Sequence, residues 1–155
     1  METNILNNSN SSPLTFIDIY KASIDSAQTA PIFTASIQAG FPSPADDYIE
    51  QQLDLNQLIV KHPSATFFVR VEGESMRDAG IFSGDILVVD RSLSPAHGKI
   101  IVAVIDGEFT VKRILIEGEK VCLAPENAAY QTIKVNPNSQ FEVWGVVTYV
   151  IHKAK

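Results

Sequence analysis

The stretch that decides the fold reads Lys99-Ile100-Ile101-Val102-Ala103-Val104-Ile105, then Asp106-Gly107, then Phe109-Thr110-Val111-Lys112-Arg113-Ile114-Leu115-Ile116. Both outer runs have the composition of β-strands. An Asp-Gly dipeptide between two such runs favours the type I′ turn of a β-hairpin. We therefore expect an antiparallel hairpin whose second strand is largely apolar on both faces.

Two adjacent cations, Lys112 and Arg113, interrupt the second strand of this hairpin. The apolar pattern does not decide which of them points inward. Their chemistry does, because arginine keeps its proton whereas a buried lysine can lose it. An unperturbed lysine pKa of about 10.4 would have to fall by roughly three units for the amine to act as a base at pH 7. Lys112 is therefore the candidate general base.

The partner of such a base would be a serine, since a hydroxyl is a weak nucleophile until a neighbour takes its proton. Ser75 lies in Gly73-Glu74-Ser75-Met76, a turn that follows the apolar run at 66–71. A turn at a strand end exposes the Oγ atom. We expect the backbone N–H groups of Ser75 and Met76 to form an oxyanion hole, an assignment that follows from the mechanism. Taken alone, either side chain is more often structural.

Several short motifs keep both identity and spacing along the chain. They are Gly73-Glu74-Ser75-Met76, Gly80-Ile81, Gly84-Asp85, Val89-Asp90, Gly107-Glu108, Thr110-Val111-Lys112 and Leu123-Ala124-Pro125-Glu126-Asn127. From about Gly40 to the C-terminus the chain resembles the LexA/UmuD group of self-cleaving serine-lysine peptidases, and its UmuD-like members in particular. The resemblance implies Ser75 as nucleophile and Lys112 as general base. It also implies a mainly β, LexA/signal-peptidase-like coiled β-sheet domain with one or two short helices and an extended N-terminal arm.

Ala39-Gly40 is the expected cleavage site. Two small residues let the backbone approach a buried nucleophile, and the Phe-Pro-Ser-Pro run at 41–44 restricts the chain beyond them to extended conformations. The resemblance implies a cut at an Xaa-Gly bond in this position. It would divide the chain into an N-terminal arm, residues 1–39, which is removed, and a peptidase and dimerisation domain, residues 40–155.

The rest of the chain predicts further elements. We expect strands at 66–71, 86–90, 121–123 and 143–151, and a short helix at 56–61 capped by Asp54 or Asn56. The run at 46–53 is ambiguous between a strand and a helical turn. Scattered apolar residues at 14–40 indicate either an extended strand lying in a groove or a loosely packed N-terminal strand.

Composition narrows the class of protein. A chain of 155 residues with 45% hydrophobic content can build one ordinary core. The net charge of -6 argues against direct DNA binding, which needs a basic surface. The longest apolar run, 100–105, is far shorter than the roughly 20 residues that cross a bilayer, and no secretion signal precedes it. We expect a cytoplasmic protein without membrane contact.

Other chemistries have weaker support in the sequence. His62, His97 and His152 lie in polar or terminal contexts, which does not favour a Ser-His-Asp triad, and their spacing does not predict a zinc site. The adjacent carboxylates Asp46 and Asp47 are typical of a solvated or capping position. We therefore predict no metal and no cofactor.

The resemblance also implies a role for the cut. UmuD-like proteins are homodimers of the bacterial SOS response, cleaved with the help of a RecA filament on single-stranded DNA. The product is the accessory subunit of an error-prone translesion polymerase with a Y-family catalytic subunit. LexA-like repressors carry a DNA-binding domain, for which 39 residues with one Lys and no Arg are too short. The alternative is a dimeric polymerase- or regulator-binding module with a vestigial site, or a regulator of other cleavable proteins acting in trans.

Overall fold

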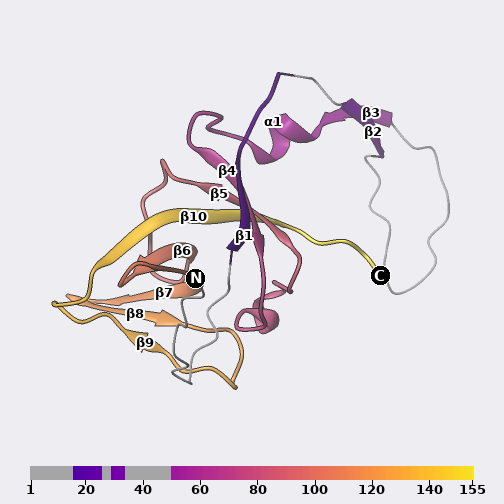
Figure 1. Ribbon diagram of the computed structural model, residues 1–155. Helices are drawn as coiled ribbons and strands as arrows, with labels where there is room; N and C mark the ends of the chain where they lie inside the picture. Colours follow the sequence, from indigo (N-terminus) through magenta and orange to yellow (C-terminus); the bar gives the residue numbers. More distant parts are fainter. Residues whose placement is uncertain (1–15, 26–28, 34–49) are drawn as a thin grey trace, which may run out of the picture.

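The computed structural model describes residues 16–25, 29–33 and 50–155 (Figure 1). In these ranges the protein is mainly β, which confirms the expected fold class. Its elements, in chain order, are β1 (Phe16–Lys21), β2 (Thr29–Phe33), β3 (Glu50–Asp54), α1 (Leu55–Ile59), β4 (Thr66–Val71), the 3-10 helix η1 (Arg77–Ala79), β5 (Ile86–Asp90), β6 (Ile100–Ile105), β7 (Glu108–Glu117), β8 (Lys120–Ala124), β9 (Ile133–Lys134) and β10 (Phe141–Ile151).

Eight of these strands form one antiparallel sheet in the order β1-β4-β5-β10-β6-β7-β8-β9. The long strand β10 lies between β5 and β6 and joins the two halves of the sheet (Figure 1). The register of β10 shifts once against each neighbour. The shift against β6 lies between Val143 and Gly145 of β10, and the shift against β5 lies between Val147 and Tyr149 of β10. Such irregularities increase the local twist, so β10 lets the sheet coil. Among the described strands, β2 and β3 pair only with each other.

The hairpin predicted from the sequence is β6 and β7. Ile105 pairs with Glu108, and the two turn residues have φ angles of 50° at Asp106 and 86° at Gly107. Positive φ at both central positions is the requirement of a type I′ turn. Strands β4 and β5 also have the bounds expected for them, and a glycine marks one end of each: Gly73 lies in the turn after β4 and Gly84 in the turn before β5.

The short helix begins one residue earlier and ends two residues earlier than the sequence predicts. Asp54 caps α1, since its carboxylate accepts a hydrogen bond from the Asn56 N–H at 2.9 Å. At the other end Val60 is extended and buried, so the chain leaves the helix to place this side chain in the interior. Of the ambiguous run at 46–53, residues 50–53 belong to strand β3, and the others lie outside the described residues.

Two clusters of buried side chains form the core. The first cluster comprises Val69, Val71, Met76, Ile81, Leu87, Val89, Val102 and Val111. The second cluster comprises Ile101, Ala103, Ile114, Leu123 and Val146. The first takes residues from β4, from the turn after β4 and from β7. The serine and the lysine named above therefore lie on segments that are anchored in the same core cluster.

Gly145 is a point of close contact in strand β10. A Cβ atom there would lie 2.6 Å from Val89 Cγ1 and 3.3 Å from the Asp90 carbonyl oxygen. We expect Gly145→Ala to lower the free energy of unfolding by about 1–3 kcal/mol, because β5 would have to move away from β10. Urea denaturation measures this change. Glu142→Ala, at an exposed position of the same strand, is the control and should change stability by less than about 0.5 kcal/mol.

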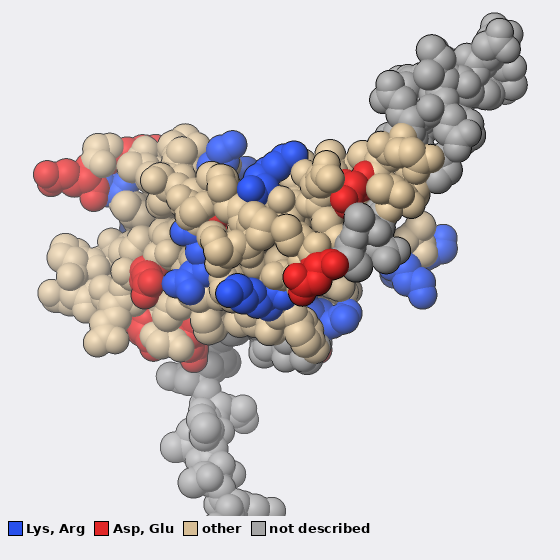
Figure 2. All heavy atoms as spheres, turned by 90° about the horizontal axis from the view of Figure 1, so that it is seen from above, with Lys and Arg blue, Asp and Glu red and all other residues tan. Residues whose placement is uncertain are grey.

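The charged side chains do not segregate by sign on the face that Figure 2 presents. Lysine and arginine side chains lie there among acidic residues and a larger area of uncharged ones. Among the helices of the described ranges, none is long and apolar enough to cross a membrane.

Candidate active site

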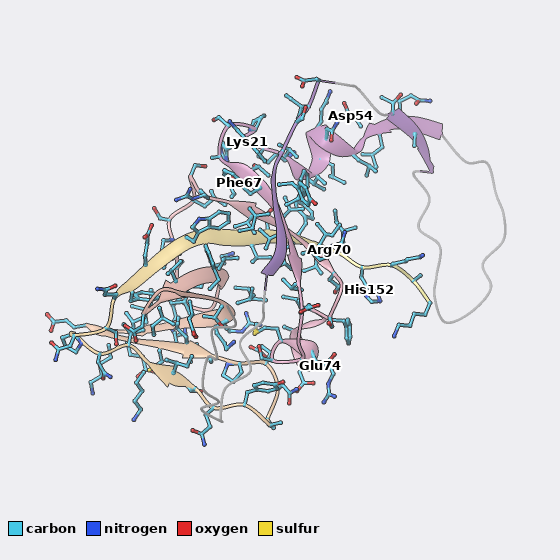
Figure 3. The ribbon with its side chains drawn as sticks, in the orientation of Figure 1. Lys21, Asp54, Phe67, Arg70, Glu74 and His152 are labelled. Atoms are coloured by element: carbon cyan, nitrogen blue, oxygen red, sulfur yellow. The ribbon has the colours of Figure 1, made fainter. Side chains whose placement is uncertain are left out.

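Ser75 lies in a turn that follows strand β4. Gly73, with φ of 100°, redirects the chain, and the carbonyl of Met76 then accepts hydrogen bonds from the N–H groups of Ala79 and Ile81. Figure 3 labels Glu74 at this turn, beyond the end of β4. Met76 and Ile81 have no exposed surface and belong to the first core cluster. Their burial holds the turn in place, and Ser75 itself is fully buried.

Lys112 reaches Ser75 from strand β7, although 37 residues separate them in sequence. Lys112 Nζ lies 3.1 Å from Ser75 Oγ. The same nitrogen donates to Thr110 Oγ1 at 2.8 Å and to the carbonyl oxygen of Val111 at 2.9 Å. The lysine side chain is only 4% exposed and Thr110 only 3%. The structure thus brings together the two residues that the sequence singles out, and it adds Thr110, for which the sequence predicted no role.

The surroundings of Lys112 favour the uncharged amine. Burial lowers the pKa of Lys112 from 10.5 to about 8. Among the described residues, no carboxylate lies within ion-pair distance of its Nζ. A neutral amine has two N–H donors and one lone pair. Thr110 Oγ1 and the Val111 carbonyl take the two donors, which leaves the lone pair for the hydroxyl of Ser75.

The backbone around Ser75 offers unused donors. Within the described part of the chain, the N–H groups of Ser75 and Met76 have no hydrogen-bond acceptor. Buried N–H groups without a partner are rare, because each costs free energy. Two such groups beside a hydroxyl are available to bind a developing negative charge.

A loop after strand β8 fastens the serine turn from outside. The Glu126 N–H donates to the Ser75 carbonyl at 2.8 Å, and the Asp78 N–H donates to the Glu126 carbonyl at the same distance. The side-chain amide of Asn127 donates to the Glu74 carbonyl, also at 2.8 Å. Three hydrogen bonds therefore fix the backbone on both sides of the hydroxyl. The sequence identifies this loop only through the motif Leu123-Ala124-Pro125-Glu126-Asn127, as part of the resemblance.

Arg113 connects the same loop to the strand that carries the lysine. Its Nε donates to the Glu126 carboxylate, and its Nη1 donates to the Gly98 carbonyl at 2.6 Å. Adjacent residues of a strand point to opposite faces, so Arg113 reaches the loop while Lys112 reaches the serine. Both side chains of this ion pair are about one-third exposed, so it contributes little to the free energy of unfolding. Its role is to hold the loop at Glu126 against strand β7.

The expected cleavage site, Ala39-Gly40, lies outside the described residues. The strands on either side of it are described. Phe33, the last residue of β2, pairs with Glu50, the first residue of β3. The bond thus lies within a connection, residues 34–49, whose two ends are held together.

The three histidines lie elsewhere. The Asp90 carboxylate forms hydrogen bonds with both the His62 ring and the Ser92 hydroxyl. In a Ser-His-Asp triad the imidazole lies between the carboxylate and the serine hydroxyl, so this arrangement is not a triad. Burial raises the pKa of Asp90, but hydrogen bonds from Ser92 and His62 outweigh it and hold the pKa below its usual value. His152 pairs with Asp85 and His97 with the backbone of Ile116.

A hollow of about 540 Å³ lies next to the His62 and Asp90 pair, away from the serine and lysine. It is lined by Ile59, Lys61, His62, Asp90, Leu93, Ser94, Lys99, Val146, Val147, Thr148 and Tyr149. None of these residues hydrogen-bonds to Ser75 or Lys112. In the described ranges no cluster of three or more His, Cys, Asp or Glu residues is placed to hold a metal ion.

Comparison with known proteins identifies relatives that span most of the chain. The family described as Peptidase S24-like matches residues 31–148. Protein MucA of Salmonella typhimurium is 48% identical over 135 residues, which cover 86% of this chain and 92% of that protein. Protein ImpA of Shigella flexneri is 48% identical over 131 residues, 84% of this chain and 89% of its own length. The LexA repressor of Psychromonas ingrahamii is 38% identical over 119 residues, 76% of this chain but 56% of that protein.

Proposed function

Because the chain belongs to the peptidase S24-like family, we propose that it is a UmuD-like serine-lysine endopeptidase that cuts its own Ala39-Gly40 bond. The observation that carries this proposal is the contact between Lys112 Nζ and Ser75 Oγ at 3.1 Å, in a buried site that disfavours the ammonium form. A neutral amine within hydrogen-bond distance of a serine hydroxyl is placed to take its proton and so activate it as a nucleophile.

The reaction follows from the protons that these groups can hold. Lys112 takes the proton of the Ser75 hydroxyl, and Oγ attacks the Ala39 carbonyl carbon. The N–H groups of Ser75 and Met76 bind the resulting oxyanion. When the bond to Gly40 breaks, Lys112 returns the proton to the leaving amine, and residues 1–39 remain as an ester on Ser75. Water then attacks the ester carbonyl while Lys112 takes a proton from it. As the ester bond breaks, Lys112 gives this proton to Ser75 Oγ, and the freed Ala39 carboxyl group loses its own proton to solvent.

Three features of the site support this sequence of proton transfers and attacks. Thr110 and the Val111 carbonyl orient the amine, so that its lone pair points to the hydroxyl. The loop at Glu126 and Asn127 fixes the serine backbone, which removes motion that the attack would otherwise have to restrict. The tethered bond is a single-turnover substrate. No metal or cofactor takes part in any of these steps.

We infer the purpose of the cut from the UmuD-like character of the chain. The product, residues 40–155, would act as a homodimer and as the accessory subunit of an error-prone translesion polymerase with a Y-family catalytic subunit. A RecA filament on single-stranded DNA would promote the cut during the SOS response. The protein would work in the cytoplasm.

Mass spectrometry of the purified chain tests the reaction. Incubation at alkaline pH is expected to release residues 1–39 and leave a product that begins at Gly40 and has 116 residues. Ser75→Ala should abolish this product, because it removes the hydroxyl whose proton Lys112 takes. A wild-type chain that stays intact even with a RecA filament would instead favour a binding module with a vestigial site.

A further inference from the structure

Strand β1 occupies an edge of the large sheet and lies upstream of the proposed cut. It pairs antiparallel with β4, and Lys21 lies opposite Phe67, both labelled in Figure 3. Ile19 lies opposite Val69, and the register shifts once between Phe16 and Asp18. On its other side β4 pairs with β5 over five residues. The chain thus covers one edge of β4 with a segment that self-cleavage would detach.

The edge of β4 that meets β1 can be identified from the backbone. The Ala22 N–H donates to the Thr66 carbonyl at 3.0 Å, so Thr66 faces β1. Backbone groups alternate along a strand, so Phe68 and Arg70 also face β1. Val71 faces the other way, because its N–H donates to Asp85 and its carbonyl accepts from Gly84.

Among the residues of β1 whose side chains are described, 19–21, little apolar surface holds the strand in place. Ile19 is 41% exposed and Tyr20 59% exposed, and Lys21 is exposed as well. Ala22, just past the strand, is the one buried residue in this segment whose side chain is described. In contrast, Val69 and Val71 of β4 are fully buried within the first core cluster. The loss of β1 would therefore leave β4 in place, with the outward N–H and C=O groups of its edge unpaired.

We propose that this edge of β4 is a docking site for an extended segment of a partner protein, and that the chain's own β1 occupies it until the cut. The proposal rests on the proposed self-cleavage at Ala39-Gly40. The seated strand shows which occupant fits: an extended segment that adds antiparallel to residues 66–71 by main-chain hydrogen bonds. A partner segment with the same residue pattern as β1 would carry apolar residues opposite Phe68 and Val69. It would carry an acidic residue opposite Arg70, the position at which β1 has Asp18.

The cut changes the competition for the edge. While the chain is intact, residues 22–65 tether β1 to β4, and tethering gives an effective concentration on the order of millimolar. In the described part of residues 1–39, the strand pairings that would still hold this fragment after the cut are β1 with β4 and β2 with β3. The latter is an isolated two-stranded ribbon, which is marginally stable in water. The fragment therefore leaves on dilution, and a partner segment can take its place.

A labelled peptide of residues 15–25 serves as the probe for this site. Fluorescence anisotropy should show binding to the self-cleaved chain, and binding at least about 100-fold weaker to intact Ser75→Ala chain, since the tethered strand competes. Equal binding to both chains, or no binding to the cleaved chain up to about 1 mM peptide, would overturn the proposal.

Hydrogen exchange reports on the edge without any substitution in β4. The amides of Phe68 and Arg70 should be protected in the intact chain, exchange rapidly in the cleaved chain, and regain protection with the peptide. The amides of Val69 and Val71, which face β5, should stay protected throughout. Protection of Phe68 and Arg70 in the cleaved chain alone would mean that the old fragment or a second copy fills the edge, and the proposal would fail.

A matched pair of variants separates main-chain from side-chain contacts. In the cleaved chain, Phe68→Pro removes an N–H that faces only the edge and should reduce peptide binding at least about tenfold relative to Phe68→Ala. Thermal unfolding checks that each variant is folded. Equal peptide binding by two folded variants would count against strand addition.

The docking site can also be tested if self-cleavage fails. A Ser75→Ala chain with the recognition sequence of a site-specific protease in place of residues 37–42 is cut by adding that protease. Peptide binding after this cut supports the docking site without reference to the dyad. If the peptide does not bind after this cut, the docking site is refuted, and the proposed self-cleavage is not affected.

Discussion

Replacement of Lys112 with methionine is expected to reduce self-cleavage at least about 1000-fold at every pH, while the chain stays folded. Methionine has a similar length but no lone pair that can accept the proton of Ser75. Mass spectrometry of the product against time gives the rate. Lys112→Arg is the matched control, because it keeps a donor and a charge but does not give up its proton. It should be equally inactive, and a variant that still cuts would exclude Lys112 as the base.

The same substitution has a second, pH-dependent consequence. Because the folded pKa of Lys112, about 8, is below the ordinary 10.5, the unfolded chain binds more protons between these values. The stability of the wild type should therefore rise with pH in this window. Below pH 8 the full cost of the buried charge is present. Relative to Lys112→Met, the wild type should gain about 2 kcal/mol between pH 7 and pH 10, measured by urea denaturation at each pH. No gain would mean that the amine is hydrated.

The local elements could be predicted from the sequence because local chemistry determines them. Gly73 follows strand β4 and Gly84 precedes strand β5, and Asp106-Gly107 has the backbone angles that its turn type demands. The helix was placed within two residues, with Asp54 as the cap that the sequence left open against Asn56. The motif resemblance is confirmed by relatives at 48% identity.

Pairing between distant segments could not be predicted. The sequence left open whether residues 14–40 lie in a groove or form a loose strand. The structure places 16–21 at a sheet edge and 29–33 in a separate ribbon with β3. These positions depend on partners that lie 17 or more residues away, and one segment's apolar pattern does not identify its partner. The ambiguous run at 46–53 was unresolved for the same reason.

The candidate site shows a similar division. Periodicity could not choose between Lys112 and Arg113, and only the chemistry of the two side chains favoured Lys112. The structure places Lys112 against Ser75 and Arg113 against Glu126. The supporting contacts of Thr110 and of the Glu126 and Asn127 backbone were not predicted. They involve ordinary hydrogen bonds between segments, for which residue types alone carry little information.

Self-cleavage should become faster as pH rises, by about 100-fold between pH 6 and pH 9. The reactive form of the site contains the neutral amine, whose fraction grows about tenfold per pH unit below the pKa of Lys112, about 8, and saturates above it. The rate plotted against pH should therefore have a slope near one on logarithmic axes and a plateau above about pH 8.5. Circular dichroism at each pH checks that the chain stays folded over this range.

A Ser75→Ala chain at each pH gives the background of cleavage by hydroxide, which also rises with pH but has no plateau. The plateau is thus the part of the profile that belongs to a titrating group. Its midpoint identifies the group, since Asp90, whose pKa is lowered, would titrate far below this range. A midpoint near 10.5 would mean that burial does not act on Lys112, and a rate that falls with pH would require an acid in place of the amine.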